Sequence, residues 1–161
     1  MRNHWFYPAV LLAVTLLAVF ASGQQLTVQD ESGKQTVLTR ADVEALPRVK
    51  VTTSAASSSA TFDGVALNSV LEKAGVALGE TMKGKRMASY LLAEAADGYR
   101  VVFALPEIDP AFGDKRVILA FLKDGKPLDA KEGPYRIVVP DEKRMARWVR
   151  QVTTLKIIAA P

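Results

Sequence analysis

The residue types that most often perform enzyme chemistry are nearly absent from this chain. It contains no cysteine, and its one histidine, His4, lies close to the amino terminus. Once a leader segment carrying His4 is removed, as argued below, the chain cannot build a Ser-His-Asp or Cys-His arrangement, an iron–sulfur cluster or a usual zinc site. General acid–base work could fall to Asp, Glu, Lys or Tyr, but the spacing of the carboxylates indicates no pair. We therefore assign no catalytic residue and no metal ligand from composition.

Three arginines near the carboxyl end are the main candidates for binding chemistry: Arg136, Arg144 and Arg147. A guanidinium group presents a planar fork of N–H donors that suits phosphate and carboxylate, so we expect these side chains to contact a small anionic ligand. The alternative is that they are surface arginines at strand ends, paired with Asp141 or Glu142. The chain has 21 Lys and Arg against 17 Asp and Glu but no basic block, so nucleic acid is not an expected partner.

Asp97 and Tyr99 complete the set of candidate ligand-binding residues. The dipeptide formed by Asp97 and the glycine after it separates two apolar runs, residues 87–95 and 99–105. Both residues of such a dipeptide tolerate positive φ, so the pattern predicts a tight hairpin turn. Asp97 and Tyr99 then have a structural interpretation as well, as a turn former and a strand aromatic.

The elements expected to position these residues are mostly short strands. Alternating or continuous apolar runs predict strands at 26–29, 36–38, 49–51, 87–95, 99–105, 117–122, 135–139 and 149–158. A capping box at Thr39 and Asp42 predicts a short helix through Leu46, and a second helix is expected over residues 67–74. The small polar stretch 52–61 predicts a flexible loop, and segment 79–86 is expected to be exposed. Strands without regular βαβ alternation indicate a single α+β domain with mixed or antiparallel sheets.

The amino-terminal segment has the three parts of a secretory signal peptide. Arg2 provides a basic start, residues 9–20 are apolar, and small residues precede Gln24. We expect residues 1–23 to be the signal peptide, cleaved after Gly23, and residues 24–161 to form a periplasmic or secreted domain. The alternative is a retained membrane anchor, and the membrane is a partner only in that case. The apolar core is shorter than the roughly 20 residues that span a bilayer.

The order of several sequence pieces resembles the molybdopterin-binding domain of the sulfite oxidase type. No piece is specific alone, but their order and spacing cover nearly all of the chain after the leader. The pieces are FDGVAL (62–67), LEKAGV (71–76), DGY (97–99), LPE (105–107), ILAF (118–121), DGKPL (124–128), GPYRIVVP (133–140) and RMARW (144–148).

This resemblance implies an α+β fold that binds a molybdenum–pterin cofactor, with the metal held by the pterin dithiolene and one protein cysteine. The chain departs from the pattern in two places. Where the family has its cysteine, this sequence has the Ser/Ala/Thr stretch, and Ser54 lies nearest the expected position. The glycine-bearing loop that helps hold the cofactor phosphate is replaced by the shorter, partly acidic segment 141–143. Ser54 is therefore the candidate metal ligand if a metal is bound.

Three functional hypotheses follow. The first is an exported, non-catalytic binding or accessory module for a small anionic or pterin-like ligand, or for a protein partner in the cell envelope. The second is a molybdenum-cofactor-dependent oxidoreductase with Ser54 as an atypical ligand. The third is an interaction or sensor protein in which side chains fill the former site. Trp148 is expected to be a core residue in each case. The residues themselves assign no cofactor, and molybdopterin is implied by the resemblance alone.

Overall fold

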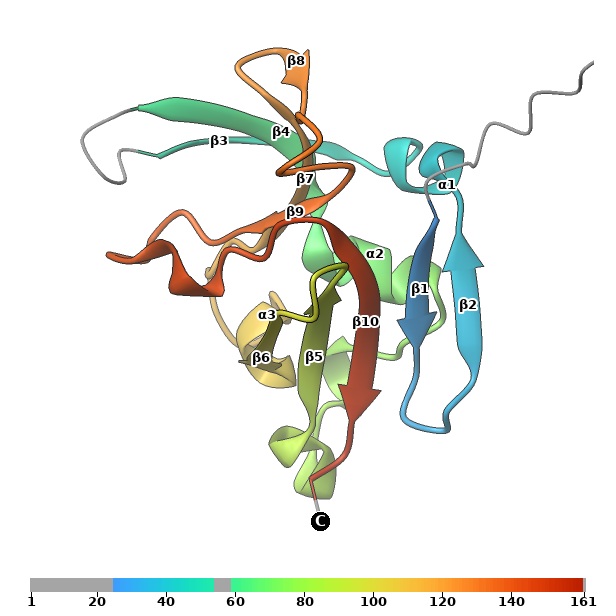
Figure 1. Cartoon of the computed structure of the whole chain (residues 1–161). Coiled ribbons are helices and arrows are strands. Elements are labelled where there is room, and N and C mark those ends of the chain that lie inside the picture. Colours follow the sequence, from blue (N-terminus) through green and yellow to red (C-terminus); the bar gives the residue numbers. More distant parts are fainter. Residues whose placement is uncertain (1–24, 54–58, 161) are drawn as a thin grey trace, which may run out of the picture.

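Two five-stranded sheets form the body of the protein (Figure 1). The computed structural model describes residues 25–53 and 59–160. In the first sheet the strand order is β2 (Gln35–Leu38), β1 (Leu26–Gln29), β10 (Val152–Ile158), β5 (Tyr90–Ala95) and β6 (Arg100–Ala104). In the second sheet the order is β3 (Arg48–Thr53), β4 (Ala60–Ala66), β7 (Ile118–Lys123) and β8 (Lys126–Pro127), with β9 (Arg136–Val138) also paired to β7. β1 and β10 are parallel and the other pairs are antiparallel, so the predicted α+β domain with mixed and antiparallel sheets is confirmed.

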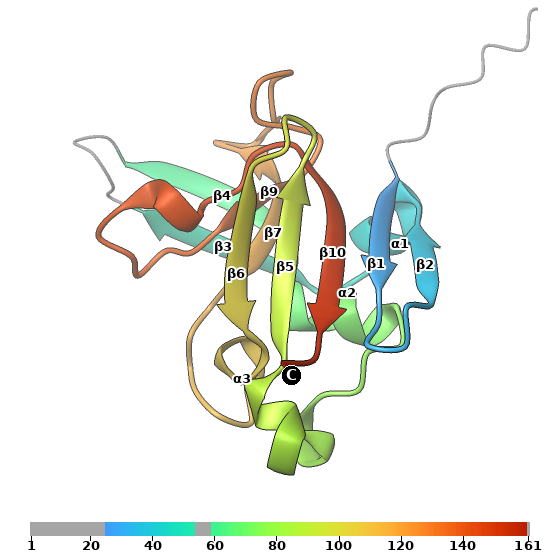
Figure 2. The same cartoon turned by 60° about the horizontal axis from the view of Figure 1, so that its bottom comes forward.

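The core lies between the sheets because their inner faces carry the apolar half of each alternating pattern. In Figure 2, β6, β5 and β10 stand in front, and β3 and β4 run across behind them. Val101 and Phe103 of β6 are buried while their neighbours in the strand are exposed. β7 is buried on both faces over its first four residues, as its continuous apolar run predicts. Within the described residues, the connections contain the short α-helices α1 (Arg40–Glu44), α2 (Leu67–Lys73) and α3 (Leu105–Ile108) and the short 3₁₀ helices η2 (Gly79–Thr81), η3 (Gly84–Ala88) and η4 (Met145–Arg147).

Two aspartates organise local turns in the first part of the chain. The predicted capping box is present, because Asp42 accepts a hydrogen bond from the Thr39 backbone N–H at 2.9 Å and its own N–H donates to the Thr39 hydroxyl. Asp30 accepts from the Ser32 hydroxyl at 2.6 Å and from the backbone N–H of Lys34 at 3.0 Å. The side-chain hydrogen bond in each case lowers the pKa of the carboxyl group. Each aspartate therefore stabilises the fold while ionised, and this contribution is lost as the pH falls through its lowered pKa.

Several sequence-based boundaries differ from the structure. The predicted loop 52–61 is too long, because β3 runs through Thr53 and β4 begins at Ala60. The pairing of β3 with β4 continues into both ends of the predicted loop, and the local composition gives no sign of this pairing. α1 ends at Glu44 rather than continuing through Leu46. Met82, in the segment expected to be exposed, is buried in the core. The expected signal peptide 1–23 and Ser54 lie outside the described residues.

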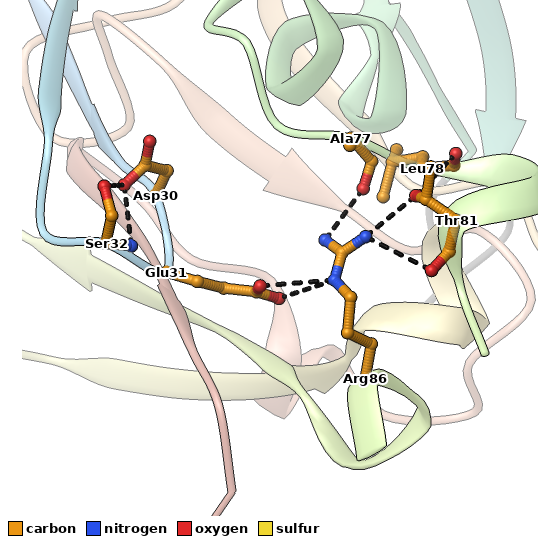
Figure 3. A network of polar contacts seen from close by, with 7 residues as sticks. All are labelled: Asp30, Glu31, Ser32, Ala77, Leu78, Thr81 and Arg86. Carbon is orange, nitrogen blue, oxygen red and sulfur yellow. Dashed lines mark hydrogen bonds and ion pairs between the residues drawn. The ribbon is translucent and has the colours of Figure 1, made fainter. Parts of the chain in front are cut away.

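Arg86 holds the connection after α2 against the turn between β1 and β2 (Figure 3). Its Nε donates to Glu31 at 3.2 Å, one terminal nitrogen donates to the Thr81 hydroxyl at 2.8 Å, and the other donates to the Ala77 carbonyl at 2.9 Å. These bonds occupy every nitrogen of the guanidinium group. Arg86 is therefore a structural residue that joins these two segments.

Within the described ranges, no helix is both long and apolar enough to cross a bilayer.

Gly64 of β4 lies close against the backbone of β7. The register of this pair shifts between Asp63 and Gly64. A Cβ added at Gly64 would lie 2.6 Å from the Cα of Ala120 and closer still to the carbonyl oxygen of Leu119. Both obstacles are backbone atoms of the buried strand β7, so they cannot move without separating the two strands.

Gly64→Ala is therefore expected to lower the free energy of unfolding by about 3 kcal/mol, because the added methyl group overpacks a rigid contact. Gly113→Ala is the matched control, since a Cβ there meets no atom within 4 Å and the backbone is not left-handed. It should change stability by less than about 0.5 kcal/mol. Urea denaturation followed by circular dichroism measures both values. Equal effects of the two substitutions would contradict the close contact of β4 with β7.

Candidate functional site

A cavity of about 450 Å³ lies where the turn between β5 and β6 meets the segment before β9 and the connection from η4 to β10. We call it the arginine pocket. Three of the residues expected to bind a ligand, Arg136, Asp97 and Tyr99, line it together. The full lining is Asp97, Tyr99, Glu132, Arg136, Met145, Ala146, Trp148 and Arg150.

Arg136 is a buried cation at the centre of this lining. It is only 7% exposed, and its guanidinium carbon lies 5.4 Å from the ring centre of Phe62 and 5.3 Å from that of Trp148. The two rings meet edge to face, with centroids 5.7 Å apart. Aromatic faces attract a cation, and the attraction is stronger where water is excluded. The sequence-based alternative of a solvated surface arginine is therefore wrong for Arg136.

Only some of the N–H groups of the Arg136 side chain have hydrogen-bond partners. One terminal nitrogen donates to Glu132, whereas Nε is buried without a hydrogen-bond partner in the described structure. Burial lowers the pKa of Arg136, the ion pair with Glu132 opposes this shift, and the nearby charge of Arg150 lowers the pKa further. A buried N–H without a partner is costly, and this cost adds to that of removing the Arg136 charge from water.

Two carboxylates line the pocket together with the two arginines. Glu132 pairs with Arg136 and also lies 3.6 Å from the Nζ of Lys123. Asp97 accepts a hydrogen bond from the backbone N–H of Tyr99 at 3.0 Å. This bond fixes Asp97 in the turn, as the structural interpretation expected, and leaves its charge at the pocket wall. The pocket thus contains both signs of charge.

The segment 142–148, which we call the strap, forms one wall of the pocket. Tyr99 donates its hydroxyl hydrogen to the carbonyl oxygen of Ala146 at 2.6 Å. Trp148 donates its indole N–H to the Val139 carbonyl at 2.9 Å and is 5% exposed. Trp148 is therefore a core residue, as expected, that also lines the pocket. Tyr99 therefore fixes the strap to the turn between β5 and β6 of the first sheet, and Trp148 fixes it to the residue after β9 of the second sheet.

Arg147 lies outside the pocket lining. It donates to Glu107 at 2.9 Å and to Glu142 at 2.8 Å, and its guanidinium carbon lies 4.9 Å from the ring centre of Phe103. Burial opposes its charge, but the hydrogen bonds to Glu142 and Glu107 outweigh that effect and raise the pKa of Arg147. The expected alternative, pairing with Glu142, describes this residue. Arg147 anchors the strap to α3.

The remaining sequence-based candidates are not brought to the pocket. Arg144 is exposed at the start of η4 and does not line the cavity. Ser54 lies outside the described residues. Sequence reasoning missed Glu132 and Arg150, which do line the pocket. Glu132 precedes Arg136 by four residues, but in a loop this spacing carries no signal. Arg150 follows Trp148 by two residues, within the stretch that was expected to be strand.

Comparison with known proteins gives two findings. The family model described as "Oxidoreductase molybdopterin binding domain" matches residues 18–161. A crystal structure of the sulfane dehydrogenase SoxCD from Paracoccus pantotrophus is similar in fold, with a TM-score of 0.63 and 25% sequence identity. The match covers 83% of this chain and 38% of that chain, so this protein spans well under half of the SoxCD chain. No curated protein matches the sequence.

The Tyr99 hydroxyl provides a test of the strap. Tyr99→Phe removes only the hydrogen bond to Ala146, which contributes about 1 kcal/mol, so the Trp148 amide should exchange its hydrogen about fivefold faster. Hydrogen exchange measured by NMR or mass spectrometry gives this rate. Tyr90→Phe is the matched control, because the Tyr90 hydroxyl makes no hydrogen bond within the described ranges. Unchanged exchange in Tyr99→Phe would show that the strap is held without Tyr99.

Proposed function

Because this chain belongs to the oxidoreductase molybdopterin-binding domain family, we propose that it uses the family's fold as a non-catalytic module that binds a small anionic or pterin-like ligand. The supporting observation is the arginine pocket. Arg136 lines this cavity, and Arg150 places a second guanidinium group there. Guanidinium groups in this arrangement suit an anionic acceptor.

The residues of this chain do not fit a molybdenum centre of the family's kind. The resemblance implies a cysteine thiolate as the protein ligand, and the chain has no cysteine at any position. Among the residues that the structure describes, no three His, Cys, Asp or Glu side chains lie together in a way that could hold a metal ion. We therefore derive no reaction step through molybdenum and assign no catalytic residue.

The alternative is a molybdenum-dependent oxidoreductase that uses Ser54 as its metal ligand. The family match favours it, because the family name describes oxidoreductases that bind molybdopterin. Against it, a serine hydroxyl is far less acidic than a cysteine thiol, whose pKa is about 8.5, and so forms the anionic ligand less readily. The other possible occupant of the pocket is a segment of a protein partner in the cell envelope.

Export is part of the same proposal. A basic start, a short apolar core and small residues before Gln24 support a cleaved signal peptide at residues 1–23. The ligand would then be met in the periplasm or outside the cell, by a domain comprising residues 24–161. Without a cysteine to form disulfides, the stability of that domain depends on the core between the two sheets.

Arg150 should determine anion affinity at the pocket. With pterin-6-carboxylate as the probe, Arg150→Gln is expected to weaken binding about tenfold, because a charge-assisted hydrogen bond is lost. Arg144→Gln removes another exposed arginine nearby, outside the pocket, and should leave binding unchanged. Titration calorimetry gives the affinities, and thermal unfolding checks that both variants are folded. Failure of the unmodified protein to bind the probe, or equal loss in both variants, would contradict the proposed site.

Cleavage of the leader can be tested directly on expressed protein. Amino-terminal sequencing of the exported form should start at Gln24 or within one or two residues of it. Gly23→Phe should slow processing, because signal peptidase requires small residues at the cleavage site. Gln25→Phe, beyond that site, serves as the control. A membrane-bound product that retains Met1 would instead support the anchor alternative.

A further inference from the structure

The charges that line the arginine pocket are balanced rather than basic. Arg136 and Arg150 are matched there by Glu132 and Asp97. A site built for a multiply charged anion usually carries an excess of cations and donors. The arrangement of these four groups therefore restricts the kind of ligand that the pocket can hold.

Arg136 already forms an ion pair with Glu132. Its terminal nitrogen is hydrogen-bonded to Glu132, and the second oxygen of Glu132 lies 3.6 Å from the Nζ of Lys123. Separating a buried ion pair is strongly unfavourable because each charge is left without a partner. A second full negative charge beside Arg136 would also be repelled by Glu132. Arg136 therefore offers a ligand no free positive charge.

Arg150 and Asp97 are the charges that remain for a ligand. Neither forms an ion pair within the part of the chain that the structure describes, and both line the cavity. Arg150 can bind one anionic group. Asp97 uses one carboxylate oxygen for the Tyr99 backbone N–H, and its other oxygen can accept a hydrogen bond from a cationic or N–H group of a ligand.

The body of the ligand would contact a thioether and an aromatic side chain. Tyr99 is 48% exposed and Met145 is 41% exposed, although both are large apolar side chains at the pocket lining. The cavity of about 450 Å³ has room for a ring system. Thioether and aromatic groups contact flat, polarisable molecules well.

We propose that the arginine pocket selects a dipolar ligand, with a planar body, one anionic group for Arg150 and a cationic or N–H-donating group for Asp97. The inference rests on the proposed function, that this pocket binds a small ligand, and adds the class of ligand. Glu132 acts as the specificity-determining residue, because it neutralises Arg136 and so disfavours ligands that carry two negative charges.

Three benzene derivatives of matched shape test the proposal by titration calorimetry on the unmodified full-length protein. They are 4-(aminomethyl)benzoate, which is a zwitterion, 4-methylbenzoate, which is a monoanion, and terephthalate, which is a dianion. The zwitterion should bind about tenfold tighter than the monoanion, and the dianion should bind most weakly. Asp97→Asn should remove the advantage of the zwitterion over the monoanion. Asp114→Asn, an exposed aspartate outside the pocket, should preserve it.

Glu132→Gln tests the specificity residue. It frees the charge of Arg136, so the affinity for terephthalate should rise about tenfold. Glu142→Gln, which alters the partner of Arg147 outside the pocket lining, is the matched control and should not raise it. Should Glu132→Gln fail to fold, the order of the three compounds on the unmodified protein still decides. Terephthalate binding as tightly as the zwitterion would overturn this inference alone, whereas binding of none of the compounds or of the pterin probe would overturn the proposed function as well.

Discussion

The burial of Arg136 is the interaction on which the candidate site depends. A cation that is only 7% exposed requires contacts that replace its lost hydration, and three different segments supply them. Phe62 comes from β4, Trp148 from the end of the strap, and Glu132 from the loop before β9. Each of these side chains is constrained by the need to contact the guanidinium group. The cavity is the space left beside that arrangement, and the ion pair with Glu132 explains why Arg136 adds no free positive charge to it.

The strap extends this constraint to the surface of the first sheet. Trp148 joins it to Arg136, Tyr99 joins it to the turn between β5 and β6, and Arg147 joins it to Glu107 of α3. Arg147 thus contributes to the site through the position of the strap and not as part of the pocket lining. Arg136 and Arg147 look equivalent in the sequence. They have different roles because they differ in burial and in the carboxylates with which they pair.

Local patterns in the sequence predicted the parts of the structure that depend on neighbouring residues. The capping box at Thr39, the hairpin turn after Asp97 and the buried strand β7 were predicted because each is encoded within a few positions. The pocket could be predicted only in part. The partner of Arg147 on α3 lies 40 residues away in the sequence, and the contact of Phe62 with Trp148 joins segments still further apart. No local pattern marks Glu132 or Arg150, so the charge balance of the site became visible only in three dimensions.

The absence of cysteine matters because this chain belongs to a molybdopterin-binding family. The fold is present, but the residue that the resemblance implies as the metal ligand is not. The most direct test is the molybdenum content of protein purified from its native cells, measured by elemental mass spectrometry against protein concentration. The account predicts no stoichiometric molybdenum. One molybdenum atom per chain, lost in Ser54→Ala, would contradict it and identify the protein as a molybdenum enzyme with a serine ligand.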